Sequence, residues 1–273
     1  MPQATLALVL ALTANTAMTP VKVDPQAGTI LAPHRATYDI ELKKAADQSG
    51  VDNMSGRMVY EFNGSACGGY KTNFRFVTKI ETGDQVSVTD QQIQTFENLA
   101  AKRFDFESKS FTDDKLDKDV KGAAIGKTDG VQVELREPQK RELQLANALF
   151  PAQHVLEMID KARSGNRFFE ARIFDGTEDG DKSYLTTTVL GKSEKLAGDN
   201  KDPLFGRTYW PVSIAYYEDK SDGDQLPIYT QSFNLYDNGV TRDLTLDYGD
   251  VILTGKLSKL ELLPPAQSCK VEK

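Results

Sequence analysis

This chain of 273 residues has few of the residues on which common catalytic sites depend, with only two histidines and two cysteines. No G-x-S-x-G elbow, P-loop or G-x-G-x-x-G motif occurs, and neither histidine has a second one at metal-ligand spacing. We interpret His34 and His154 as packing or surface residues. The sequence therefore predicts no enzyme, no cofactor and no metal site, although a dispersed triad stays open because triads are recognised by geometry.

Basic residues are outnumbered by acidic ones, with 33 Lys and Arg against 40 Asp and Glu. The net charge is -7, with a sequence pI near 5.1. Nucleic-acid-binding proteins carry basic patches that neutralise phosphates, so we expect no nucleic-acid partner.

Long apolar runs are absent as well, because no stretch reaches the roughly 20 residues of a transmembrane helix. One shorter run, residues 4–14, is followed by small residues and Pro20. This pattern is typical of the apolar region and cleavage site of a secretory signal. We predict that residues 1–18 are signal-peptide-like and that residues 30–273 form one exported, soluble domain. No Lys or Arg precedes the run, so a short apolar helix packed on the body is the alternative.

The two cysteines lie far apart in the sequence, and both are in turn-like surroundings. Cys67 is in "SACGG", ahead of an expected strand, and Cys269 lies four residues from the C-terminus. In an exported chain, two such thiols favour a disulfide that ties the C-terminal tail to the body. A nucleophilic Cys67 paired with a histidine is the weaker alternative.

Alternation of apolar and polar residues with period two dominates the rest of the chain. In "YKTNFRFVTKI" the apolar residues Tyr70, Phe74, Phe76 and Ile80 share one face, as in a half-buried antiparallel strand. Similar segments are separated by Gly and Asp turns, expected at residues 63–64, 82–84, 129–130, 237–239 and 248–250. More than ten such strands predict a mainly β fold, an antiparallel meander curled into a barrel or half-barrel.

One segment, "FPAQHVLEMIDKARSG", has helical spacing instead. Its apolar stripe consists of Ala152, Val155, Leu156, Ile159 and Ala162. We expect this single amphipathic helix to lie across the sheet or to plug its mouth. The segment before it, residues 136–151, is interpreted as a connection with one strand.

The candidate binding residues are aromatic. Four aromatic residues lie on strands in which apolar and polar residues alternate: Phe74, Phe76, Trp210 and Tyr216. We predict that they line a groove for an apolar or amphipathic ligand. Core packing is the alternative for Trp210 and Tyr216. Two acidic loops, residues 175–181 and 218–225, are candidates for calcium binding. The first resembles the start of an EF-hand loop but has Thr186 where the bidentate Glu should be and no helix before it, and we interpret both loops as turns.

Several stretches resemble the EipB family of periplasmic cell-envelope integrity proteins of alphaproteobacteria: "LAPHRATYDIELKKA", "GRMVYEFNGSACGGYKTNFRF", "FPAQHVLEMIDKA", "FDGTEDGDKSY" and "YDNGVTRDLTLDYGDVILTGKLSKLELLP". The resemblance implies a β-spiral, an unclosed β-barrel with one helix at its mouth, similar to lipoprotein carriers of the LolA and LolB type. It also implies a periplasmic location and a disulfide between Cys67 and Cys269, and it supplies no catalytic residues.

From this resemblance we expect a non-enzyme that supports envelope integrity. It would act through a hydrophobic groove that binds a lipid-like ligand, a lipoprotein or a periplasmic protein partner. The alternatives are a dedicated lipid or lipoprotein carrier and an enzyme that acts on envelope polymers.

Overall fold

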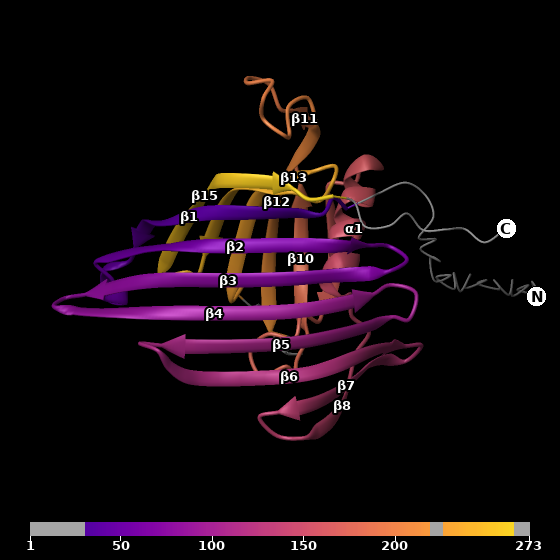
Figure 1. The fold of residues 1–273 in the computed structure, drawn as a ribbon, viewed down its shortest axis with the longest axis horizontal. Coiled ribbons are helices and arrows are strands. Elements are labelled where there is room, and N and C mark those ends of the chain that lie inside the picture. The colour runs from indigo at the N-terminus through magenta and orange to yellow at the C-terminus, as the bar shows by residue number, and fades with distance from the viewer. Residues whose placement is uncertain (1–30, 219–225, 265–273) are drawn as a thin grey trace, which may run out of the picture.

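The computed structural model describes residues 31–218 and 226–264 (Figure 1). These residues form a 15-stranded antiparallel sheet with one α-helix, which confirms the predicted mainly β fold. The predicted signal segment, Cys269 and most of the second acidic loop lie outside the described residues.

The strands vary from long arms to short end pieces. They are β1 (His34–Ala45), β2 (Asn53–Ser65), β3 (Gly69–Thr82), β4 (Gln85–Asn98), β5 (Arg103–Thr112), β6 (Lys115–Lys127), β7 (Gly130–Glu137), β8 (Arg141–Leu145), β9 (Phe168–Ile173), β10 (Tyr184–Leu190), β11 (Glu194–Lys195), β12 (Thr208–Glu218), β13 (Tyr229–Tyr236), β14 (Thr241–Asp247) and β15 (Val251–Leu262). A short 3-10 helix, Asp47–Ser49, and one α-helix, α1 (Pro151–Arg163), complete the described elements.

The order of the strands makes the sheet a spiral. It runs β8-β7-β6-β5-β4-β3-β2-β1-β15-β14-β13-β12-β10-β9, and β11 pairs with β12. The layer of β1 to β6 crosses the layer of β10 and β12 steeply, with α1 at one end (Figure 1). The end strands β8 and β9 are not paired with each other in the described residues. A single bridge, between Leu149 after β8 and Ile173 at the end of β9, connects the two ends. The barrel is therefore unclosed over the residues that the structure describes.

A loop packs across the gap between the two ends of the sheet, where no strands pair. Residues 174–183, between β9 and β10, lie on the inner face of β5 to β7, where Phe174 joins a second core with Phe104, Phe106 and Phe150. At Gly176 (φ +70°) an added Cβ would lie 2.5 Å from the Phe106 ring. Only glycine permits this close approach.

The acidic residues of this loop are engaged in contacts within the protein. Asp175 Oδ1 accepts hydrogen bonds from the backbone N–H and the hydroxyl of Thr177. Asp179 lies 3.0 Å from the Lys118 ammonium on β6. The loop therefore works as a turn that docks on the neighbouring strands.

The predicted turns lie where expected, with one exception. Asn63 and Gly64 do not form a turn, because both belong to β2 and the chain reverses two residues later, at residues 66–68. A Cβ on Gly64 would lie only 2.1 Å from the carbonyl oxygen of Gly69. Glycine is needed at position 64 so that β3 can approach closely. The Asn-Gly pair therefore looks like a turn in the sequence although it lies within a strand.

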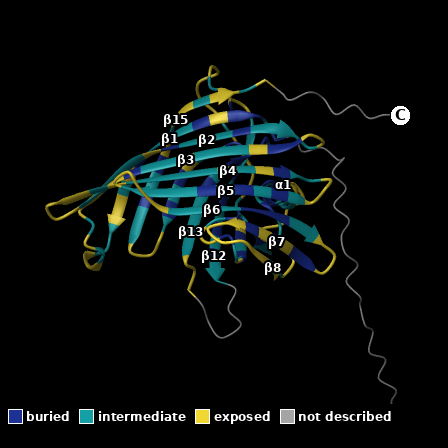
Figure 2. Ribbon diagram, turned by 60° about the horizontal axis from the view of Figure 1, so that its bottom comes forward, coloured by how far each residue is buried: buried dark blue, intermediate teal, exposed yellow. Residues whose placement is uncertain are grey.

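Helix α1 covers the expected segment but buries a broader face than the apolar stripe predicts. Its buried residues are Ala152, His154, Met158, Ile159 and Ala162, whereas Val155 and Leu156 are half-buried. The curved sheet surrounds the helix on more than one side, so residues flanking the stripe are covered too. Buried positions in β5 to β7 gather beside the helix, and the turns are exposed (Figure 2).

Candidate functional site

The four predicted groove aromatics come from two distant strands. Phe74 and Phe76 lie on β3, and Trp210 and Tyr216 lie on β12. Strands β2, β1, β15, β14 and β13 separate them in the sheet. Curling of the sheet brings all four side chains to one hydrophobic cluster on the inner face.

Their burial differs, however. Trp210 is 4% exposed and Tyr216 is 8% exposed, while Phe74 and Phe76 are only half-buried. The rings of Phe74 and Phe76 meet edge to face, with centroids 6.4 Å apart. The pair on β3 is thus the accessible part of the predicted groove.

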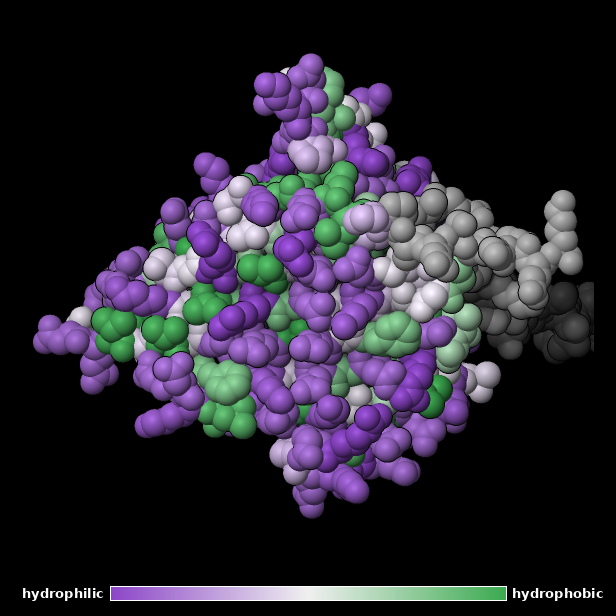
Figure 3. Space-filling view, in the orientation of Figure 1, coloured by the Kyte–Doolittle hydropathy of each residue, from purple (hydrophilic) through white to green (hydrophobic). Residues whose placement is uncertain are grey.

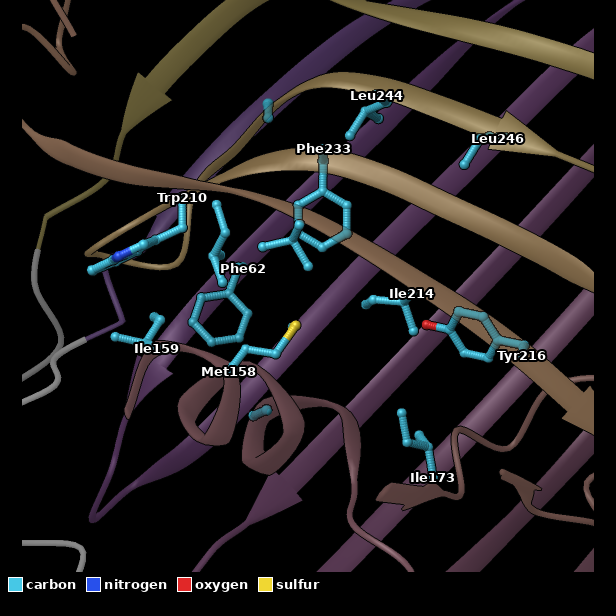
Figure 4. Packing of buried hydrophobic residues seen from close by; sticks show 14 of the residues in the cluster. Phe62, Met158, Ile159, Ile173, Trp210, Ile214, Tyr216, Phe233, Leu244 and Leu246 are labelled. Carbon is cyan, nitrogen blue, oxygen red and sulfur yellow. The ribbon is translucent and has the colours of Figure 1, made fainter. Parts of the chain in front are cut away.

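The two buried aromatics occupy opposite ends of the core. Trp210 lies near Phe62 and near Met158 and Ile159 of the helix, as in the core-packing alternative (Figure 4). It also borders an open cleft of about 310 Å³ at the C-terminal end of α1.

Tyr216 lies at the other end of the core, with Ile214 and Ile173 (Figure 4). It stacks on Tyr229 at a ring separation of 4.2 Å. Burial raises the pKa of Tyr216 to about 12, so its hydroxyl stays neutral.

Other half-buried apolar side chains pack on the same buried cluster as the accessible pair. We call this set, with the pair included, the inner-face row: Leu42, Met54, Phe74, Phe76, Tyr229 and Val251. Each packs on the buried cluster and keeps part of its surface open. Apolar surface left open inside a curved sheet is the usual wall of a site for an apolar ligand.

The outer face of the β1 to β6 layer is different in character. Oppositely charged side chains pair across its strands, for example Arg75 with Asp90 at 2.8 Å and Lys121 with Glu107 at 2.8 Å. Hydrophilic residues cover most of this face, and apolar ones occur in small groups (Figure 3). The larger apolar surface is therefore on the inner side.

A buried carboxylate fixes the helix to the sheet. Glu97 on β4 is 2% exposed, and its two oxygens accept hydrogen bonds from the backbone N–H groups of Ala152 (2.7 Å) and Gln153 (3.0 Å). Gln153 in turn accepts a hydrogen bond from the N–H of Phe150 at 3.0 Å. Side chains thus satisfy the free N–H groups of the first turn of α1.

Opposing effects act on the pKa of Glu97. Burial disfavours the ionised carboxylate and raises the pKa, whereas the two backbone hydrogen bonds lower it. Burial dominates, and the pKa rises to about 7.

A small cavity of about 60 Å³ lies beside this carboxylate. Its walls include His34, Tyr60, Phe62 and Tyr70, whose rings follow one another at centroid separations of 5.6, 6.3 and 5.0 Å. His34 is buried, and its Nδ1 lies 2.7 Å from the carbonyl oxygen of Ala32. Burial lowers the pKa of His34, so the ring is neutral at physiological pH.

His154 and the acidic residues are the remaining candidates for catalysis or metal binding. His154 is buried against Phe169, and burial lowers its pKa to about 4. Residues 31–218 and 226–264 contain no cluster of three or more His, Cys, Asp and Glu that could hold a metal ion. No helix in the same residues is long and apolar enough to cross a membrane.

Cys67 lies in the exposed turn between β2 and β3, with its Sγ 3.8 Å from the hydroxyl oxygen of Ser65. Its expected partner, Cys269, is outside the described residues. The disulfide between them therefore stays a prediction.

Comparisons with known proteins assign the chain to a family. The EipB-like family model matches residues 25–264. The chain belongs to the EipB-like family. It is 46% identical over 237 residues to the cell envelope integrity protein EipB of Brucella abortus (strain 2308), covering 85% of this chain and 84% of that protein.

A solved structure supports the same assignment. This EipB-like chain is similar to the crystal structure of a β-barrel-like protein of a domain of unknown function from Brucella abortus, with a TM-score of 0.83 and 44% identity. The match covers 87% of this chain and 100% of that one. This EipB-like protein therefore shares its fold with a relative of solved structure.

Sequence reasoning missed Glu97 in this EipB-like protein because it missed strand β4. That strand, "QVSVTDQQIQTFEN", is mostly polar and has no clear apolar alternation. One signal was available: Ile93, Thr95 and Glu97 share a strand face, which places the carboxylate on the same side as an apolar residue. A carboxylate on an inward face requires hydrogen-bond partners, and the first turn of a nearby helix can supply them.

Proposed function

We propose that this EipB-like protein supports the integrity of the bacterial cell envelope as a non-enzymatic periplasmic protein. The identity of 46% to a protein named for that role, over most of both chains, supports this proposal. The apolar run at residues 4–14 supports export to the periplasm.

The proposed mode of action is binding of an acyl chain, as a lipid or as part of a lipoprotein, along the inner-face row. The observation that carries it is the half-burial of Phe74 and Phe76 inside an unclosed barrel. Each methylene that leaves water contributes roughly 0.8 kcal/mol, so a chain of several methylenes gains enough to bind without strong polar contacts. The largely hydrophilic outer face offers no comparable surface on the side seen in Figure 3.

A complementation experiment tests the role and the mode together. A strain that lacks the gene is expected to become sensitive to detergent in the medium, and the wild-type chain should restore resistance. Phe76→Ser should fail to restore it, because the substitution removes apolar surface from the inner-face row. Val88→Ser is the matched control, since Val88 on β4 is 42% exposed.

The amount of folded variant in the periplasmic fraction is measured alongside, because Phe76 also packs on the core. Full rescue by folded Phe76→Ser would contradict the binding mode but leave the envelope role standing. Unchanged detergent resistance in the deletion strain would contradict the role itself.

A further inference from the structure

The cleft at the C-terminal end of α1 faces a hydrogen-bond donor that the described residues leave without a partner. Trp210 lines this cleft and is 4% exposed, with its ring pointing away from Phe233 (Figure 4). Its indole N–H makes no hydrogen bond within the described part of the chain. The polar side-chain atoms there that are both enclosed and unpartnered belong to His154, Thr188 and Asn238. The indole nitrogen is not among them, so it is accessible, and the space that it reaches is the cleft.

Groups of both charges and two hydroxyls surround this donor. The other walls of the cleft are Ala162, Arg163, Ser193, Thr208 and Asp237. Arg163 Nη2 donates a hydrogen bond to the carbonyl oxygen of Asp237 at 3.3 Å, so the end of the helix is joined to the turn between β13 and β14. The Asp237 carboxylate accepts a hydrogen bond from Arg207 at 3.0 Å, and its side chain is 27% exposed. It can therefore accept a further hydrogen bond from a ligand.

The charges around the cleft favour a neutral ligand. An anion would be attracted by Arg163 but repelled by Asp237, and a cation would be affected in the opposite way. Either one would also lose hydration on entering the cleft. A charged group therefore gains little here, whereas a neutral polar group can form hydrogen bonds without that cost.

Hydroxyl groups of a ligand fit these side chains, because each hydroxyl can donate one hydrogen bond and accept others. Trp N–H groups in buried rings usually have a partner, so Trp210 requires an acceptor oxygen. Asp237 requires a donor, and the hydroxyls of Ser193 and Thr208 can act as either. The cleft volume of about 310 Å³ lies at the lower end of the roughly 300–1,000 Å³ of small-molecule sites. This combination indicates a compact ligand with several hydroxyls.

We propose that this cleft binds a neutral saccharide unit. One sugar hydroxyl accepts a hydrogen bond from the Trp210 indole N–H, and a second donates one to the Asp237 carboxylate. The faces of the Trp210 ring are buried in the core and do not stack on the sugar, so we expect binding in about the millimolar range. No residue of the inner-face row lines the cleft. The inference therefore goes beyond the proposed function and does not depend on it.

The test is a titration of the ¹⁵N-labelled purified protein followed by NMR. Trp210 is the only tryptophan of the chain, so the spectrum contains a single indole signal, which reports directly on the cleft. The probes are glucose, glucuronate as an anion with the same ring, and glucosamine below neutral pH, where its amine is protonated. We expect a saturable shift with glucose and at least tenfold weaker binding of both charged sugars, equivalent to about 1.4 kcal/mol or more.

Asp237→Asn keeps the shape of the side chain and replaces the carboxylate by an amide. It should weaken glucose binding about tenfold and narrow the difference between glucose and glucuronate, because the repelling charge is gone. Asp129→Asn at an exposed turn position should change neither. Phe76→Ser should bind glucose like the wild type, so a failure of acyl-chain binding and a failure of sugar binding are told apart. If Asp237→Asn does not fold, the three sugars on the wild-type protein decide.

The saccharide can come from a glycan of the cell envelope or from a free sugar, and sedimentation with purified peptidoglycan distinguishes the two. Co-sedimentation of the wild type but not of folded Asp237→Asn would indicate a glycan. Glucose binding without co-sedimentation would indicate a free sugar.

The proposal is overturned if the indole signal shows no saturable shift with glucose up to about molar concentration. Binding of glucuronate or glucosamine as tight as that of glucose, or undiminished glucose binding to folded Asp237→Asn, would overturn it equally.

Discussion

Replacing Glu97 by Gln should change how the stability of the protein depends on pH. The ordinary pKa of a glutamate is 4.5, and burial raises that of Glu97 to about 7 in the folded protein. The folded state therefore keeps a proton that the unfolded state has already lost between these two values. Stability from this residue is fully present at low pH and is lost as the pH rises toward about 7.

The size of the effect follows from the two pKa values. Proton linkage between a pKa of 4.5 and one of about 7 makes the wild-type protein lose about 2 kcal/mol between about pH 5.5 and about pH 8. Gln cannot titrate, so Glu97→Gln lacks this loss. Gln offers only one acceptor atom to the two N–H groups of α1, which costs the variant about 1–3 kcal/mol at every pH.

Urea denaturation of both proteins across this pH range measures the gap in their free energies of unfolding. The buried histidines act in the opposite direction, because their lowered pKa values make stability fall as the pH drops below about 6.5. They are present in both proteins and cancel in the difference. The wild-type advantage should shrink by about 2 kcal/mol from about pH 5.5 to about pH 8.

The control is Glu142→Gln at an exposed position on β8, which should follow the wild-type curve in parallel. A gap between wild type and Glu97→Gln that stays constant within about 0.5 kcal/mol would show that folding does not raise the pKa of Glu97, since a difference of one pKa unit between the folded and unfolded states corresponds to about 1.4 kcal/mol.

Three further predictions concern stability. Gly176→Ala should cost about 2–4 kcal/mol from positive φ and overpacking and make the loop at residues 174–183 sensitive to protease, whereas Gly83→Ala, with positive φ but open space, should cost only about 1–2 kcal/mol. Reduction, or Cys67→Ser, should lower the melting temperature by the equivalent of about 2–4 kcal/mol without abolishing the fold, and free thiols in peptide maps of unreduced periplasmic protein would rule out the disulfide. Ile159→Ala should cost about 2–5 kcal/mol in thermal unfolding because this fully buried side chain anchors α1, and a loss under 1 kcal/mol would show that the helix is loosely held.

Much of the fold follows from local patterns that the sequence displays. The alternation in β3, β7, β12, β13 and β14 predicts half-buried strands, and the short glycine-containing segments predict their turns. Helix α1 was predictable because its apolar spacing differs from that of every other segment.

The missed strands show where such patterns fail. In β4 the inner residues include Gln91 and Thr95, so no apolar alternation marks the strand. In β6 the inner residues Gly122 and Ala124 are small, and they lie opposite Phe106 and Phe104 of β5. The Phe106 ring fills the space next to Gly122. Their inner faces are set by contacts with neighbours distant in sequence, which local spacing does not encode.

The residues of the candidate site were likewise only partly predictable from the sequence. The aromatic residues of β3 and β12 could be predicted as site residues because apolar and polar residues alternate clearly in both strands. Their different burial depends on the position of α1, and the link between Glu97 and the helix depends on strand register. Asn238 lines the cavity beside Glu97, although in the sequence it is an ordinary turn residue.

Native mass spectrometry of protein gently purified from the periplasm shows whether an acyl chain is bound along the inner-face row. We expect an added mass that matches a lipid or an acylated peptide in the wild-type protein and in Val88→Ser. That mass should be lost or strongly reduced in folded Phe76→Ser. Wild-type protein that carries no such mass and takes up none from added phospholipid or acylated peptide would contradict the proposed binding.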